Sequence, residues 1–335
     1  QKGKAYEQIS SFVGVLRMYK LTGRIEYLEA MLAAWQDIVD NRLFITGTTA
    51  NHEFFMHKHV LPAEPQDNVG EGCVTARWLF FNRELFQITG EAKFIDEIER
   101  TIYNALLASQ DPHLGLQSYF TPLNGSRGYV MYSLNTGGPP CCSSSVAREI
   151  ARIPATMWSK PVDGGLAVLL YESGKLQDVV SATDGSQVAL AVESATDFPH
   201  SGDIKLTVTP ERKVAFKLLL RVPQWCQAFQ VKVGENEYQG APGTFLFFNR
   251  TWRLGDQVSI YMNLPIQILA GGHSYPFHHA IQRGPQVLAV DSWLSNGDVN
   301  SARFDPDQMA GLESVEANTP VGWFGDQVYT SQAVS

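Results

Sequence analysis

Residues 21–28 read Leu-Thr-Gly-Arg-Ile-Glu-Tyr-Leu, and residues 88–95, 67 positions later, read Ile-Thr-Gly-Glu-Ala-Lys-Phe-Ile. In both stretches the glycine separates two segments whose apolar residues recur every three or four positions, as on one face of a helix. Glycine often closes a helix because it adopts a left-handed backbone conformation without steric strain. The repeat therefore predicts helical hairpins, which in series are typical of an α/α toroid.

The helices can be traced on either side of these glycines. Apolar side chains follow helical spacing in 4–20 and again in 27–35. A further helix is predicted at about 143–159, with Ser143, Ser144 and Ser145 capping its start. Roughly five helices are indicated in all, whereas a complete toroid of six helical hairpins requires twelve. We therefore expect the missing barrel helices to precede Gln1 in the natural protein.

A change of period marks the second part of the chain. From about residue 164, apolar and polar residues alternate, as in half-buried strands. The clearest strands are predicted at 204–209, 229–233 and 257–261, with a more continuous apolar strand at 216–220. Turn-forming residues separate these runs, which favours an antiparallel β-sandwich. The predicted organisation is α+β: residues 1–163 as the C-terminal part of an α/α barrel, 164–291 as the β-sandwich, and 292–335 without assignment.

Composition excludes several classes of function. The net charge of −8 and the lack of a Lys/Arg-rich stripe argue against a nucleic-acid partner, because that binding depends on clustered basic residues. No apolar run approaches the roughly 18 residues that span a bilayer. The chain opens with Gln1 and without an apolar signal-peptide core, so it does not assign a compartment.

The four cysteines are too few for a disulfide-stapled scaffold. Glu71 and Cys73, with the vicinal pair Cys141-Cys142, supply three thiols and a carboxylate, which suit tetrahedral zinc. Glu71 and Cys73 stand at the start of one predicted helix. The vicinal pair stands in the loop that enters another, where the helix dipole and free N–H groups favour a thiolate. Cys226, in the β region, is predicted to be a small buried hydrophobic residue. A purely structural zinc site is the main alternative.

Several ordered motifs occur together along the chain. They are Phe44-Ile45-Thr46-Gly47 before Glu53-Phe54, Glu71-Gly72-Cys73, Tyr119-Phe120-Thr121-Pro122-Leu123, Cys141-Cys142 before Ala147-Arg148, Leu218-Leu219-Leu220-Arg221-Val222-Pro223-Gln224-Trp225, and Ile281-Gln282-Arg283-Gly284-Pro285. In this order they resemble glycoside hydrolase family 127, the former DUF1680 group typified by β-L-arabinofuranosidases. After the vicinal pair this chain has three serines where the family often has Pro-Pro-Asn, which indicates a divergent subgroup.

The resemblance implies a fold, a cofactor and an activity. The implied fold is an (α/α)6 barrel followed by β-sandwich domains. The implied activity is that of a retaining glycosidase, which removes an L-arabinofuranose-like sugar from plant-type glycans. The residues it assigns are Cys141 as nucleophile, Glu53 as acid/base, and Glu71, Cys73, Cys141 and Cys142 as ligands of Zn²⁺.

Some alternatives stay open. Tyr119 is a candidate for holding the sugar, or else a packed aromatic residue. Glu64 competes with Glu53 for the acid/base role, although its Ala-Glu-Pro context indicates a turn. The chain could also be a non-catalytic zinc-binding or carbohydrate-binding fragment. A zinc-thiolate redox protein is the third option, but an isolated redox pair is more often Cys-x-x-Cys.

Overall fold

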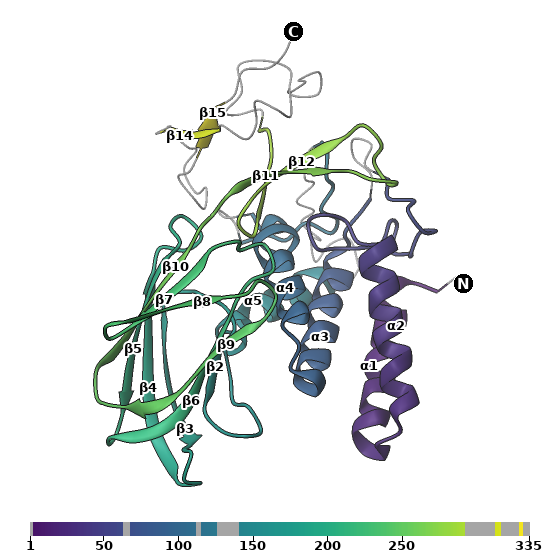
Figure 1. The fold of residues 1–335 in the computed structure, drawn as a ribbon. Coiled ribbons are helices and arrows are strands. Elements are labelled where there is room, and N and C mark those ends of the chain that lie inside the picture. The colour runs from purple at the N-terminus through teal and green to yellow at the C-terminus, as the bar shows by residue number, and fades with distance from the viewer. Residues whose placement is uncertain are drawn as a thin grey trace. The chain divides into compact units, whose positions relative to one another are not determined.

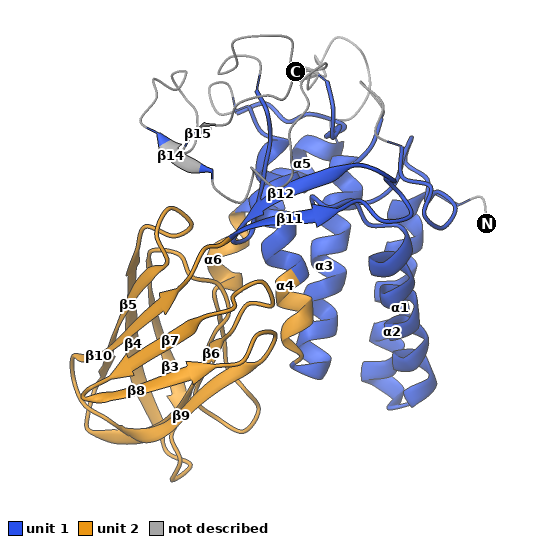
Figure 2. Ribbon diagram, turned by 45° about the horizontal axis from the view of Figure 1, so that its top comes forward, with its two compact units in different colours: residues 1–90, 97–150, 266–335 blue, residues 91–96, 151–265 orange. Residues whose placement is uncertain are grey.

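A computed structural model describes residues 3–62, 68–111, 115–125, 141–291, 312–315 and 328–330. The chain forms two compact units (Figure 2). Unit 1 comprises residues 1–90, 97–150 and 266–335, and unit 2 comprises 91–96 and 151–265. The chain thus leaves unit 1 to build unit 2 and then returns.

The described helices lie mainly in unit 1 (Figure 2), and most of them are labelled in Figure 1. They are α1 (Ala5–Thr22), α2 (Ile25–Asn41), α3 (Gly72–Thr89), α4 (Ala92–Thr101), the π-helical turn η1 (Ile102–Leu106), α5 (Cys141–Ala151) and α6 (Ile153–Thr156). The glycine signals of the repeat are confirmed. Gly23 (φ 69°) and Gly90 (φ 70°) are left-handed C-caps of α1 and α3, and each donates its backbone N–H over 2.8 Å to a carbonyl in the preceding turn. A closed (α/α)6 barrel stays a prediction.

Aromatic side chains join the helices of unit 1. Phe12 of α1 contacts Phe81 of α3, with ring centroids 5.8 Å apart. Trp35 of α2 stacks on Trp78 of α3 at 6.4 Å and donates its indole N–H to Asn82 over 2.7 Å. This hydrogen bond satisfies a polar group inside an otherwise apolar core. The core therefore holds α3, whose first turn belongs to the candidate site, in a fixed position.

The helix predicted at about 143–159 differs in the structure. It begins at Cys141, ends at Ala151 and is followed by the short α6. The predicted serine cap is wrong, because Ser143, Ser144 and Ser145 lie inside α5. Ser144 instead donates to the Cys141 carbonyl one turn back, over 3.0 Å. Pro154 explains the early end, since it lacks the N–H that a continuous helix would need.

Unit 2 contains two sheets. The four-stranded sheet has the order β1 (Trp158–Ser159), β2 (Leu166–Val168), β6 (Val214–Arg221) and β9 (Phe245–Trp252). The six-stranded sheet has the order β3 (Gly174–Ser181), β4 (Gln187–Thr196), β5 (Asp203–Pro210), β10 (Asp256–Met262), β7 (Phe229–Val233) and β8 (Asn236–Gly240). Each of the four predicted strands falls within β5, β6, β7 or β10 and is confirmed.

The burial pattern explains why these strands form layers. Along β4 and β5 every second residue is buried, as expected for strands with one face on a core. The rings of Tyr238 in β8 and Phe248 in β9 meet at 5.0 Å, which joins the two sheets. The described pairings in unit 2 are antiparallel, as predicted, except β2 with β6, which is parallel.

A further sheet lies in unit 1. It contains β11 (Ile266–Ala270), β12 (His279–Arg283) and β13 (Gln286–Leu288), which the sequence placed in the sandwich domain ending at 291. Asn104 of η1 holds this sheet, because its side chain donates to the Pro285 carbonyl over 2.9 Å and accepts from the Val287 N–H over 2.7 Å. From the unassigned segment, β14 (Glu313–Val315) and β15 (Val328–Thr330) pair antiparallel.

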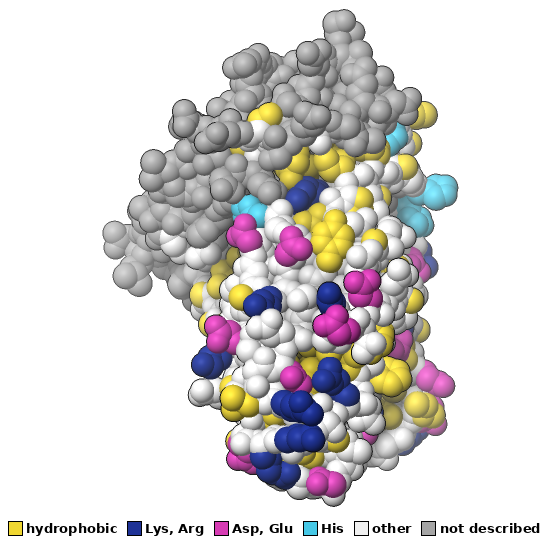
Figure 3. All heavy atoms as spheres, turned by 60° about the vertical axis from the view of Figure 1, so that its left-hand side comes forward, with side chains coloured by type: hydrophobic (Ala, Val, Ile, Leu, Met, Phe, Trp, Pro, Cys, Tyr) yellow, Lys and Arg dark blue, Asp and Glu magenta, His cyan; other side chains and the backbone are white. Residues whose placement is uncertain are grey.

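Two surface properties follow from the described residues. None of their helices combines the length and the hydropathy that a membrane span requires. On the face drawn in Figure 3, acidic and basic side chains are both spread over the surface, in keeping with the mixed composition.

Candidate active site

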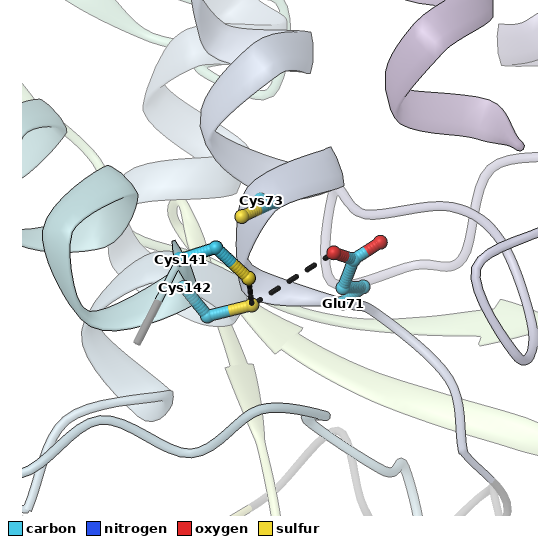
Figure 4. A group of neighbouring side chains, drawn as sticks. All are labelled: Glu71, Cys73, Cys141 and Cys142. Carbon is cyan, nitrogen blue, oxygen red and sulfur yellow. Dashed lines mark hydrogen bonds between the residues drawn. The ribbon is translucent and has the colours of Figure 1, made fainter. Parts of the chain in front are cut away.

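Four candidate metal ligands converge in unit 1. Glu71 is the N-cap of α3 and Cys73 lies in its first turn, while Cys141 and Cys142 begin α5. Figure 4 shows the carboxylate of Glu71 and the sulfur of Cys73 turned toward the vicinal pair. One ligand atom from each residue lies within 4.8 Å of all the others. The set predicted from the sequence is therefore brought together as a group that could hold a metal ion.

Glycine at position 72 allows this approach. A Cβ atom there would lie 3.0 Å from Cγ2 of Val146 and 3.2 Å from Cβ of Cys142. The backbone N–H of Gly72 also donates to the carbonyl of Tyr119 over 2.9 Å. The missing side chain thus lets the first turn of α3 lie directly against α5.

The distances within the group fit zinc. In a tetrahedral site with Zn–S bonds of about 2.3 Å, two sulfur ligands lie about 3.8 Å apart. The sulfur atoms of Cys141 and Cys142 are 3.9 Å apart, and Cys142 Sγ lies 3.8 Å from Glu71 Oε1. Three sulfurs and one carboxylate oxygen are also ligand types that zinc accepts. Both the chemistry and the spacing of the donors therefore suit this ion.

The charges of the four donors depend on one another. Hydrogen bonds from Cys142 and Ser145 lower the pKa of Cys73 to about 6. The bond to Cys73, together with burial, raises the pKa of Cys142, and burial raises that of Cys141. Burial and then the charge of Cys73 raise the pKa of Glu71 to about 8. Full deprotonation of this buried group therefore calls for a cation among the donors.

Two side chains of α5, those of Ser145 and Arg148, form a hydrogen-bonded chain that ends at Cys73. Ser145 Oγ lies 3.4 Å from Cys73 Sγ, and Arg148 donates from Nη2 to the same oxygen over 3.4 Å. With a neutral Cys73 the thiol donates to the Ser145 oxygen. A hydroxyl can also donate, so Ser145 can hydrogen-bond to the Cys73 thiolate, and this contact helps to lower the pKa of Cys73.

Glu53 lies close to the four donors. Its Oε1 accepts a 2.5 Å hydrogen bond from the Tyr119 hydroxyl, and its Oε2 forms an ion pair with Lys4. These two contacts, that of Lys4 first, lower the pKa of Glu53. Burial and the bond to Glu53 raise the pKa of Tyr119, and the charges of Glu71 and both vicinal cysteines add to this shift. One tyrosine therefore lies near both the carboxylate and the thiols.

The backbone around Glu53 has an unusual conformation. Ala50, His52 and Glu53 have φ values of 79°, 43° and 70°, a left-handed region that residues with a side chain rarely adopt. His52 is fixed by Asn51, 2.5 Å from Nδ1, and by Asn68, 3.0 Å from Nε2. Strain that the surroundings maintain is found more often at functional sites.

The remaining residues singled out from the sequence can now be compared with the structure. It brings Tyr119 and Glu53 into contact, whereas Glu64 lies outside the described residues. Cys226 is buried and donates to the Ala228 carbonyl over 3.3 Å, so its predicted structural role is confirmed. Sequence reasoning missed Lys4, because a lone lysine before a helix carries no motif.

Comparison with known proteins identifies related domains. Residues 2–155 match the domain described as "Beta-L-arabinofuranosidase, GH127 catalytic domain", and residues 165–265 match "Beta-L-arabinofuranosidase, GH127 middle domain". A curated relative, the non-reducing end beta-L-arabinofuranosidase of Bifidobacterium longum subsp. longum, is 22% identical over 90% of this chain and 50% of its own length. The chain thus spans about half the length of this relative.

Solved structures share the fold. The GH127 beta-L-arabinofuranosidase Ara127N-Se from Geobacillus stearothermophilus T6 has a TM-score of 0.73 and 24% identity, covering 85% of this chain and 46% of that protein. A second structure, described as a glycoside hydrolase, has a TM-score of 0.81 and 20% identity over 98% of this chain and 57% of that one. The fold of a helical domain followed by antiparallel sheets is therefore shared with these proteins.

Proposed function

The chain belongs to glycoside hydrolase family 127, and from this premise we propose that it is a retaining glycosidase, with Cys141 as nucleophile and Glu53 as acid/base. Its substrate would be a glycan that carries a terminal β-L-arabinofuranose-like sugar. The names of the family domains and of the curated relative support this substrate class. The alternative is a non-catalytic zinc-binding or carbohydrate-binding fragment of such an enzyme.

The difference in exposure among the four donors carries the proposal. Glu71, Cys73 and Cys142 are buried, with relative exposures of 5%, 5% and 3%. Cys141 is exposed as a residue and half-buried within the group of four donors. Of the three clustered cysteines, Cys141 is therefore the most accessible to a sugar. A nucleophile needs this access, while the remaining ligands of a metal ion do not.

We assign Zn²⁺ to Glu71, Cys73, Cys141 and Cys142, whose spacing and donor types fit it. When bound, zinc supplies the positive charge that keeps the thiols deprotonated and makes the Cys141 sulfur a better leaving group. Glu71 then serves the metal and Glu53 serves proton transfer. The two carboxyl groups thus have separate tasks.

The reaction takes two displacements at the anomeric carbon. In the first, the Cys141 sulfur forms a bond to this carbon while the glycosidic oxygen leaves with the proton of Glu53. In the second, the Glu53 carboxylate takes a proton from water, the water oxygen bonds to the same carbon, and the carbon–sulfur bond breaks. Two inversions give net retention. Tyr119 would hold the Glu53 carboxylate in place during both steps.

The test measures p-nitrophenol release from p-nitrophenyl β-L-arabinofuranoside by the zinc-loaded chain. Cys141→Ser should abolish turnover and keep the wild-type circular dichroism spectrum. Glu53→Gln should also be slow but recover with azide, which attacks the glycosyl-enzyme intermediate on Cys141 without a base. Glu64→Gln separates the two acid/base candidates and should retain turnover. Unchanged turnover in Cys141→Ser would remove Cys141 as nucleophile, and bound zinc without any hydrolysis would favour the non-catalytic alternative.

A further inference from the structure

We propose that Lys4 is a positioning residue for Glu53, one that fixes where the carboxylate lies and how readily it releases its proton. The inference rests on the proposed acid/base role of Glu53 and deepens it. Lys4 immediately precedes α1 and belongs to none of the motifs that indicated the site from the sequence.

The start of α1 is attached to the Glu53 loop through the backbone. The N–H of Ala5 donates to the Glu53 carbonyl over 2.7 Å, and Lys4 pairs with Phe54 in an isolated antiparallel bridge. These contacts place the Lys4 side chain beside the Glu53 side chain, although the two residues are far apart in sequence. The backbone contacts therefore bring the two side chains together, and the ion pair is a consequence of the fold.

The two oxygens of the carboxylate have different partners. Tyr119 donates to Oε1, and the Lys4 ammonium pairs with Oε2. A carboxylate held at both oxygens by different elements cannot rotate freely about its last torsion. Together with the left-handed backbone at Glu53, these contacts determine the orientation of the group that transfers the proton.

The charges around Glu53 favour its anion. Lys4 faces it from the start of α1 and Tyr119 from the 115–125 loop, and both lower its pKa. Glu71, at the start of α3, is the nearby like charge, and the mutual repulsion raises the pKa of Glu71. The His52 imidazole faces Asn51 and Asn68. Lys4 is thus the positive group that offsets Glu71 beside Glu53.

This arrangement has a chemical consequence. Lys4 stabilises the carboxylate that remains once Glu53 has given its proton to the leaving oxygen, so Glu53 becomes a stronger acid. The same charge reduces the fraction of Glu53 that is protonated before the reaction. Lys4 therefore determines the pH range in which the first step is efficient.

The test titrates Glu53 directly. The chain is labelled with ¹³C at the glutamate side-chain carboxyls, and the Glu53 signal is identified by its absence in Glu53→Gln. Lys4→Met keeps the length of the side chain but removes its charge, so the Glu53 midpoint should move to higher pH. Lys4→Arg restores a cation and should return the midpoint toward the wild-type value. The alkaline limb of p-nitrophenyl β-L-arabinofuranoside hydrolysis should move in the same direction.

Lys20→Met is the matched control. Lys20 is also in α1 and pairs with Glu84 over 2.8 Å, so this variant loses an ion pair of the same kind elsewhere. It should leave the Glu53 midpoint unchanged. If the Glu53 midpoint in Lys4→Met equals the wild-type value, the inference is wrong. A return of the midpoint in Lys4→Arg shows that the shift in Lys4→Met comes from the lost charge and not from misfolding. Full activity of Glu53→Gln would instead overturn the proposed acid/base role, so the two failures are distinguishable.

Discussion

The hydroxyl of Tyr119 donates a 2.5 Å hydrogen bond to Glu53, which lies 66 positions earlier in the chain. Tyr119→Phe removes this bond but keeps the ring, which packs edge-on against Phe120 at 4.7 Å. A hydrogen bond to a charged group contributes about 1.5–3 kcal/mol. We expect kcat/KM for p-nitrophenyl β-L-arabinofuranoside to fall by about tenfold or more. The melting temperature should fall as well, while the circular dichroism spectrum of the folded protein stays that of the wild type. Equal rates for both proteins would contradict this role.

Cysteine substitutions should separate metal ligands from core residues. Cys73→Ser removes a buried sulfur from the group of four donors, so we expect zinc bound per chain to fall well below the wild-type value. Cys226→Ser is the control, because Cys226 is also buried but lies in unit 2. Elemental analysis after gel filtration measures both. The ligand assignment is wrong if Cys73→Ser retains as much zinc as Cys226→Ser.

Ser145 should affect zinc without binding it. Its hydroxyl lies 3.4 Å from the Cys73 sulfur, and side chains that orient metal ligands commonly change affinity by about 10–100-fold. We therefore expect Ser145→Ala to raise the zinc dissociation constant about tenfold. Ser144→Ala, which loses a bond to a helix carbonyl of the same α5, should have a much smaller effect. Competition with a chromogenic chelator measures both constants, and equal values would disprove the role.

Two glycine substitutions in helices should have opposite effects on the free energy of unfolding. Gly72→Ala forces a methyl group to within 3.2 Å of Cys142 Cβ, so α3 and α5 must separate. We expect a loss of about 1–3 kcal/mol in the free energy of unfolding and weaker zinc binding. Gly14→Ala in α1 meets no atom within 4 Å and should gain about 0.5–1 kcal/mol. Urea denaturation measures both, and a stabilised Gly72→Ala would refute the packing argument.

Zinc binding should strengthen as the pH rises. The pKa values of Cys141, Cys142 and Glu71 are raised in the metal-free protein, so these groups hold protons at neutral pH. They must release them to bind a cation. The dissociation constant should therefore be lower at about pH 8 than at about pH 6, with protons released on binding. Competition titrations at both values provide the measurement, and a pH-independent constant would exclude these residues as ligands.

Local signals made much of the fold predictable. Gly23 and Gly90 ended helices as predicted, because a left-handed C-cap depends on one residue and its own helix. The strands could be predicted because apolar and polar residues alternate along a strand that has one face buried. The four candidate ligands could be proposed from their residue types and from the resemblance to family 127, and the structure brings the four together.

The remaining features depend on contacts between distant segments. The sequence placed residues 164–291 in one sandwich domain, but it carries no information about which strands pair, so the assignment of β11 to unit 1 could not be predicted. Ser143–Ser145 favoured a cap by residue preference, yet α5 begins at Cys141 and includes all three serines. The Lys4–Glu53 ion pair forms only because the fold brings the start of α1 next to a loop about 50 positions later in the chain. No local sequence pattern predicts this contact.

Asn104 has a consequence for how the protein is made. Its partners Pro285 and Val287 follow 181 and 183 residues later, after the whole of unit 2. At a synthesis rate of about 5–20 residues per second, that interval of 181 residues lasts roughly 10–40 s on the ribosome. During that time the Asn104 amide can bond only to water or to nearby chain, and all the strands of unit 2 are synthesised. Unit 1 is begun first and completed last.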